Sequence, residues 1–138
     1  MNYWLMKTEP ETFSYADLKK VPAEPWSGVR NYQARNHMKA MTLGDLVLIY
    51  HSGGTKEVVG VAKVVAVAHQ DPTTDDPAWQ CVDVAPVLEL TVPVSLAQIK
   101  QEPQLADMVV VRNSRLSVQP VRTEEFHRIL HLGRTELP

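Results

Sequence analysis

The sequence predicts a single α+β domain, with five or six strands in a curved sheet or small barrel and short helices between them. Its 138 residues fit one domain, which we place at residues 1–138. Hydrophobic residues make up 44% of the chain and charged residues 22%, the composition of a globular protein with a core. Short apolar runs separated by glycine, proline and asparagine predict several strands, each bounded by turns.

Two elements are predicted near the N-terminus. Aromatic and apolar residues indicate a strand over Tyr3–Lys7, which stops before Pro10. Ser14, followed three residues later by Asp17, has the pattern of a helix N-cap and predicts a short helix to about Lys20.

Prolines and an asparagine define the next two segments. Pro22 and Pro25 force extended backbone up to Trp26. Asn31 then predicts the N-cap of a second helix, which runs to about Met41.

The central part of the chain predicts a hairpin and a further strand. Two glycines separate apolar Leu46–His51 from Val58–His69, as expected for paired strands joined by a turn. Asp71–Ala78, with two prolines and three aspartates, is predicted to be a solvated loop. Trp79–Leu90 reads as a strand in which Pro86 causes a break, a bulge or an edge position.

The last third predicts a short helix, two strands and a final helix. Ser95 begins the helix, which reaches about Lys100, and Met108–Arg112 and Leu116–Val121 are predicted as strands. Thr123 is predicted to cap the final helix. That helix carries acidic residues in its first turn, an apolar stripe and a glycine C-cap: Glu124, Glu125, Phe126, Ile129, Leu130 and Gly133.

Composition excludes several classes of protein. No apolar stretch approaches the ~18 residues that a membrane span needs, and no basic region precedes the short apolar run at the N-terminus, as a signal peptide requires. Cys81 is the only cysteine and cannot form an internal disulfide. We therefore expect a cytoplasmic protein, or a nuclear one if the source is eukaryotic, without a membrane partner.

Charge is distributed unevenly, although the net charge is only −2. Residues 26–44 contain Arg30, Arg35 and Lys39, and residues 108–123 contain three more arginines, while neither segment contains an acid. If the two segments meet in space, they form a basic face suited to phosphate groups. The alternative, equally supported by this pattern, is that the arginines form structural ion pairs.

No catalytic, metal or cofactor motif stands out. His127 and His131 have the spacing of a two-histidine metal pair, but Arg128 stands where a metalloprotease has glutamate. Cys81 is predicted to be an inert buried thiol, and the glycine-containing segment 51–56 matches no nucleophile or phosphate-loop motif. We therefore expect no enzyme activity, no metal and no cofactor.

The segment Trp26–Asn36 (WSGVRNYQARN) is the densest in recognition chemistry. It supplies aromatic rings for stacking, amides and hydroxyls for the edge of a base, and arginines for phosphates. A base bound outside a helix needs these three kinds of contact. From composition alone, a tryptophan that belongs to the core is the alternative.

Four parts of the sequence closely resemble the EVE-domain family: Tyr3–Pro10 (YWLMKTEP), Trp26–Asn36, Gly44-Asp45 with Tyr50–Ser52, and Ser114–Val121 (SRLSVQPV). The resemblance covers nearly the whole chain. It implies a PUA-like pseudo-β-barrel of mostly antiparallel strands. The family includes the eukaryotic thymocyte nuclear proteins and is distantly similar to YTH domains.

The resemblance also implies a function. EVE domains are regarded as readers of modified bases in DNA or RNA, so we expect nucleic acid carrying a methylated cytosine or adenine, and separate effector proteins, as partners. By position, the base pocket would comprise Lys7, Glu9, Trp26, Ser27, Gly28, Val29, Tyr50, His51, Ser52 and Trp79. The phosphates would be held by Arg30, Asn31, Arg35, Arg112 and Arg115.

Several alternatives stay open. Glu9 and Trp79 could equally be capping or core residues, and Tyr32 is expected to pin its helix rather than stack on a base. The protein could instead bind a small ligand or a modified protein side chain. A small hydrolase using His51, Ser52 or Glu9 is a further alternative, which the missing triad and metal set argue against.

Overall fold

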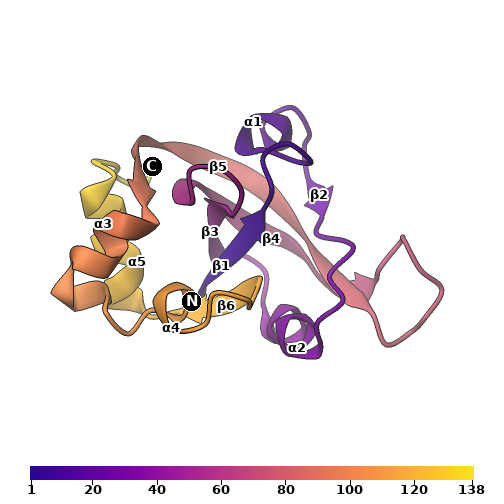
Figure 1. Ribbon diagram of the computed structural model, residues 1–138. Helices are drawn as coiled ribbons and strands as arrows, with labels where there is room; N and C mark the ends of the chain where they lie inside the picture. Colours follow the sequence, from indigo (N-terminus) through magenta and orange to yellow (C-terminus); the bar gives the residue numbers. More distant parts are fainter.

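The computed structural model describes residues 1–138 and has a six-stranded mixed sheet flanked by short helices (Figure 1). The strands are β1 (Tyr3–Thr8), β2 (Glu24–Pro25), β3 (Leu46–His51), β4 (Glu57–Gln70), β5 (Gln80–Ser95) and β6 (Val118–Val121). The helices are α1 (Tyr15–Leu18), α2 (Tyr32–Ala40), α3 (Leu96–Gln101), α4 (Val109–Arg112) and α5 (Thr123–Leu132), with a 3-10 turn at Pro103–Leu105. The predicted α+β fold is confirmed. No helix combines the length and the apolar character needed to span a bilayer.

The sheet is open and has the strand order β2-β5-β4-β3-β1-β6. Strands β1 and β3 run parallel, with Tyr3 opposite Leu46 and Thr8 opposite His51, and every other pair is antiparallel. The expected hairpin between β3 and β4 is therefore present. Because β1 and β3 are parallel, both strands end at the same edge of the sheet.

Two apolar clusters form the core, one on each side of the sheet. Alternation along β1 separates them, since Trp4 belongs to one cluster and Leu5 to the other. The first cluster includes Met38 of α2, and the second includes Phe126 and Ile129 of α5. In Figure 1, α2 and α5 accordingly lie at opposite sides of the sheet.

The long pair β4–β5 bends at a close contact between Gly60 and Tyr15. Register shifts interrupt this pair at several points, and one of them adjoins Pro86, where the sequence predicts a break or bulge. The Tyr15 hydroxyl donates to the carbonyl oxygens of Val61 (2.7 Å) and Leu88 (2.9 Å), which bridges the two strands. A Cβ atom on Gly60 would lie 2.2 Å from Cε1 of Tyr15, so the position requires glycine.

The helix caps at Ser14 and Asn31 lie where the sequence predicts them. The helix predicted to begin at Val94-Ser95 is also present, with Ser95 as its N-cap. At the last helix the cap differs by one position, because Arg122 is the N-cap residue and its N–H donates to the Glu125 carboxylate at 2.8 Å. Thr123 is instead the first helical residue.

The predicted strand Met108–Arg112 is wrong, since Val109–Arg112 forms the helix α4. Its β-branched residues favour a strand, but burial overrides that preference. Met108 and Val110 lie in the cluster shared with α5, while Val109 packs against the opposite cluster. A helical turn directs these side chains to both clusters.

The Gly60–Tyr15 contact yields a prediction about stability. Replacing Gly60 by alanine should lower the free energy of unfolding by about 1–3 kcal/mol, because the added methyl group overpacks a rigid ring. Gly53→Ala is the matched control, since its Cβ would meet only Pro10 Cδ at 3.7 Å, an ordinary contact. Urea unfolding of both variants checks this, and equal losses would contradict it.

Candidate nucleic-acid interface

A cavity of about 540 Å³ opens beside the carboxyl end of β1. Its lining residues are Lys7, Thr8, Thr12, Phe13, Glu24, Pro25, Trp26, Ser27, Gly28, Val29, Arg30 and Ser117. Segments 26–44 and 108–123 both contribute to this wall, so the structure brings the two acid-free segments together. The volume lies in the range of cavities that bind small ligands.

Trp26 and Phe13 give the cavity its aromatic surface. Trp26 is 8% exposed and belongs to the core cluster that contains Met38. The Phe13 ring meets it edge to face, with ring centroids 6.3 Å apart. The Trp26 N–H donates to the Val82 carbonyl oxygen at 2.8 Å, which fixes the backbone of this wall to β5.

The turn at Gly28 is fastened by the carboxylate of Asp71. Gly28 has a φ of +83°, a conformation that favours glycine, and its N–H donates to Asp71 Oδ2 at 2.8 Å. Arg30 Nη1 donates to the same oxygen at 3.1 Å, and Arg30 Nη2 donates to Thr73 Oγ1 at 3.0 Å. The expectation of a fully solvated loop over Asp71–Ala78 is wrong at its first residue, because Asp71 is only 1% exposed.

These contacts shift the pKa of Asp71. Burial by itself raises the pKa, but the hydrogen bonds from Thr73, Gly28 and Arg30 outweigh burial and lower the pKa to about 2. Asp71 is therefore ionised at neutral pH and neutralises Arg30. The Arg30 side chain remains 39% exposed at the cavity rim.

Trp79 lies outside the cavity lining and joins a stack in which two aromatic rings lie between two guanidinium groups. Tyr32 stacks on Trp79 at 4.8 Å between ring centroids, and the guanidinium groups of Arg30 and Arg35 lie 5.3 Å from Trp79 and 5.0 Å from Tyr32. Arg35 also donates to the Ala78 carbonyl oxygen at 2.8 Å. The stack ties α2 to the loop that precedes β5 and holds Arg30 in place.

Lys7 reaches the rim of the cavity from the end of β1. Its Nζ donates to the Ser114 carbonyl oxygen at 2.7 Å and lies 5.8 Å from the Tyr50 ring centroid. Burial lowers the pKa of Lys7. The structure does not bring Tyr50 to the cavity, because this ring is buried in the cluster with Leu48 on the other side of the sheet.

The other residues expected in the pocket lie next to the cavity rather than on its wall. His51 Nε2 accepts the N–H of Tyr15 at 3.1 Å, and burial lowers the pKa of His51. The Ser52 N–H donates to the Thr8 carbonyl oxygen at 3.0 Å. The Glu9 carbonyl oxygen accepts the N–H groups of Thr12 and Phe13, so Glu9 shapes the turn that presents the Phe13 ring.

Some of the residues expected to hold phosphates already contact other groups of the protein, and Arg115 forms no ion pair. Asn31 caps α2 by accepting the Ala34 N–H at 2.8 Å. Arg112 pairs with Asp107 at 2.9 Å, with both side chains exposed. Arg115 is exposed, forms no ion pair, and follows Ser114, the residue that Lys7 contacts.

Sequence reasoning missed part of the wall, including Phe13, Glu24 and Ser117. Phe13 follows the Tyr3–Pro10 block, and Ser117 lies inside the Ser114–Val121 block, so position in the family motifs could have indicated both. The position of Glu24 could have been inferred from alternation. In an extended segment, side chains two residues apart lie on the same face, and Glu24 is two residues before Trp26.

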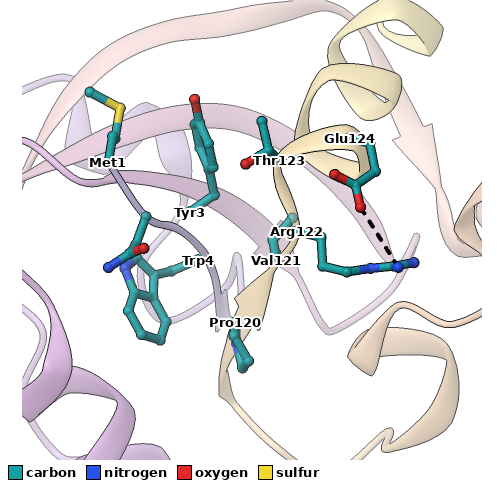
Figure 2. A pocket seen from close by; sticks show the side chains of 9 residues that line it. Met1, Tyr3, Trp4, Pro120, Val121, Arg122, Thr123 and Glu124 are labelled. Atoms are coloured by element: carbon teal, nitrogen blue, oxygen red, sulfur yellow. Dashed lines mark ion pairs between the residues drawn. The ribbon is translucent and has the colours of Figure 1, made fainter.

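A second groove, of about 490 Å³, lies at the opposite end of β1 (Figure 2). Tyr3, Val121 and Thr123 contribute to its wall. Figure 2 shows its one cation, Arg122, directed at Glu124, and Arg122 also pairs with Glu125 at 3.1 Å. The Trp26 cavity is instead lined by residues 26–30 of the recognition segment Trp26–Asn36, so we place the candidate interface there.

A third cluster brings together His69, Cys81 and Asp83, whose ligand atoms lie within 4.8 Å of one another. His69 Nε2 contacts Asp83 Oδ1 at 2.7 Å, and this pairing raises the pKa of His69. Burial raises the pKa of the Cys81 thiol to about 11, which disfavours the thiolate form that binds metals.

Comparison with known proteins identifies the family to which this fold belongs. The EVE domain model matches residues 2–132, and the chain belongs to the EVE domain family. Mouse thymocyte nuclear protein 1 is 40% identical over an alignment covering 98% of this chain and 75% of that protein. The match confirms the predicted resemblance.

Solved structures agree over the whole fold. A protein from Agrobacterium tumefaciens has a TM-score of 0.97 at 44% identity, with 100% of this chain and 97% of that chain covered. The human THYN1 protein, solved in complex with DNA containing 5-methylcytosine, has a TM-score of 0.90 at 35% identity, with 99% of each chain covered. At 16% identity, an ASCH protein from Zymomonas mobilis shares the fold at a TM-score of 0.57.

The low pKa of Asp71 predicts a pH-dependent stability. Its folded pKa of about 2 lies below the ordinary value of 3.8, so the ionised carboxylate stabilises the fold above pH 4 and loses this effect as the pH falls toward 2. Asp71→Asn should lower the free energy of unfolding by about 2 kcal/mol at pH 6. The deficit should shrink as the pH approaches 2.

Urea unfolding of both proteins from pH 2 to pH 6 checks this prediction. Asp45, whose pKa is also lowered, is present in both proteins and cancels in the difference. A deficit that stays constant across the pH range would show that Asp71 acts through packing alone.

Proposed function

We propose that this protein is a non-catalytic module that binds nucleic acid and reads a methylated cytosine or adenine base in the Trp26 cavity. The base enters from a single strand or is flipped out of a duplex, and the cations at the rim contact the flanking phosphates. Separate effector proteins are proposed as further partners.

The observation that carries the proposal is the composition of the cavity wall. It combines the aromatic rings of Trp26 and Phe13 with hydroxyl groups and the cations Lys7 and Arg30. Stacking on a π-face, hydrogen bonds to the base edge and charge for phosphates are the contacts that an extruded base requires. The solved complex of the human relative with 5-methylcytosine-containing DNA supports the same assignment.

The phosphate contacts are distributed unequally among the cations. Arg115 is free of ion pairs, and we assign it the largest phosphate contribution. Arg30 and Arg35 are held by the stack with Trp79 and Tyr32, which orients them at little further cost in side-chain entropy. Arg112 must release or share Asp107 to contact a phosphate, so its contribution is smaller.

Discrimination between a methylated and a plain base is expected to be modest. One methyl group in an apolar pocket contributes ~1–3 kcal/mol, or roughly tenfold to two-hundredfold in affinity. Phosphate contacts add affinity without telling the bases apart.

Two rival functions remain as outcomes of the test. The cavity volume of about 540 Å³ also suits a small ligand or a modified protein side chain. Hydrolysis is disfavoured, because His51 Nε2 is occupied by the Tyr15 N–H and no base–nucleophile pair lines the cavity. Binding of a free nucleoside without any binding of oligonucleotides would support the small-ligand alternative.

Trp26→Ala tests the proposed pocket. The variant should bind a methylated oligonucleotide roughly tenfold to a hundredfold more weakly, because stacking contributes about 1–3 kcal/mol per base. Fluorescence anisotropy with matched DNA and RNA oligonucleotides, plain or methylated at cytosine or adenine, measures the loss.

Tyr3→Leu is the matched control, since it removes an aromatic ring from the other groove. Circular dichroism establishes that both variants are folded at the titration temperature. Undiminished binding by folded Trp26→Ala, or a loss confined to Tyr3→Leu, would refute the assignment of the site.

Arg115→Ala tests the basic face. The variant should bind plain and methylated oligonucleotides more weakly by the same factor, and the slope of log K against log salt concentration should fall by about one. Arg134, which follows α5, provides the control Arg134→Ala, and its slope should match that of the unmodified protein. A change in the ratio of methylated to plain binding would contradict a pure phosphate role for Arg115.

A further inference from the structure

Glu24 places a carboxylate on the wall of the cavity, two residues before Trp26. It lies in β2, and the backbone remains paired with β5 through the Trp26 N–H and the Val82 carbonyl oxygen. Residues two apart in extended backbone project to the same side and are separated by about 7 Å. Glu24 and Trp26 both line the cavity, so the carboxylate and the indole belong to the same wall.

The Glu24 carboxylate has no partner in the protein. None of the ion pairs includes it. The two cations on the same wall are engaged elsewhere, since Lys7 donates to the Ser114 carbonyl oxygen and Arg30 pairs with Asp71. Burial, followed by repulsion from Asp83, raises the pKa of Glu24. The half-buried carboxylate is therefore available to accept a hydrogen bond from a ligand in the cavity.

The chemistry of pyrimidines shows what such an acceptor can distinguish. Thymine and 5-methylcytosine carry the same methyl group at position 5, so an apolar pocket for that methyl cannot separate them. They differ at position 4, where 5-methylcytosine has an amino group that donates and thymine has a carbonyl oxygen that accepts. They also differ at position 3, where the 5-methylcytosine nitrogen accepts and the thymine N–H donates, so the discrimination requires the carboxylate to face position 4. Carboxylates accept hydrogen bonds from the cytosine amino group and repel a carbonyl oxygen.

We infer that Glu24 is the specificity-determining residue that selects a 4-amino pyrimidine, 5-methylcytosine, and rejects thymine by accepting a hydrogen bond from the exocyclic amino group. The inference rests on the proposed function, because it requires the base to occupy the Trp26 cavity. Different residues then recognise the two groups of the base. The aromatic wall contacts the methyl group, and Glu24 accepts a hydrogen bond from the amino group.

The experiment compares DNA oligonucleotides that differ at one central base: cytosine, 5-methylcytosine, thymine or 5-methyl-2-pyrimidinone, which lacks the 4-amino group. The unmodified protein should bind 5-methylcytosine roughly tenfold to a hundredfold more tightly than thymine or 5-methyl-2-pyrimidinone. Glu24→Gln should bring 5-methylcytosine and thymine to within about threefold, because a glutamine amide can either accept from the amino group or donate to the carbonyl. Glu11→Gln controls for the loss of an exposed negative charge from the loop that carries Phe13.

The outcomes separate the two proposals. If the unmodified protein prefers neither 5-methylcytosine over cytosine here nor methylated adenine over adenine in the anisotropy titrations, the proposed function fails and this inference fails with it. A preference for methylated adenine alone overturns only the inference. If methylation strengthens binding but thymine binds as well as 5-methylcytosine, only the inference is overturned. Retention of the full 5-methylcytosine preference by Glu24→Gln also overturns it. The comparison with 5-methyl-2-pyrimidinone needs no variant: equal binding of this base and 5-methylcytosine overturns the inference even if Glu24→Gln does not fold.

Discussion

The buried carboxylate of Asp71 is the constraint on which the arrangement of the cavity depends. One carboxylate accepts hydrogen bonds from the Gly28 N–H, the Arg30 guanidinium, and both the N–H and the hydroxyl of Thr73. It thereby joins the turn after Trp26 to the loop after β4, although the two segments are more than 40 residues apart. Charged hydrogen bonds of this kind are stronger than neutral ones, and the burial of a lone carboxylate would otherwise be unfavourable.

The position of the cavity follows from the topology of the sheet. The parallel pair β1 and β3 ends at one edge, which brings Lys7 and Thr8 to the cavity wall. Successive side chains of β3 point to opposite faces of the sheet, and this determines which of them can lie near Lys7 and Thr8. Ile49 and Tyr50 lie on opposite sides of the sheet, and this places the Tyr50 ring in the cluster with α5 rather than beside Trp26.

Much of this arrangement could be predicted from the sequence where local chemistry decides the structure. The caps at Ser14, Asn31 and Ser95 depend on side chains that bond to nearby backbone, and the recognition segment around Trp26 combines residue types that are informative together. The helix α4 could not be predicted, because its valines favour a strand and only distant packing partners reverse that preference.

The candidate site shows the same division between local and distant determinants. Asp71 looked like one acid among several in a polar loop, and its burial depends on Gly28 and Arg30, which the chain places far away in sequence. Trp79 looked like a second aromatic wall, but Tyr32 and Arg30 take up its faces. The Phe13 ring reaches the cavity only because the Glu9 carbonyl oxygen shapes the preceding turn.

The open sheet has two edge strands, β2 and β6, and each contains a proline. Pro25 and Pro120 lack the N–H that an incoming strand would need, and both edges are short. Strand addition onto β2 and β6 is therefore disfavoured, and a partner at either of these two strands must contact side chains rather than extend the sheet.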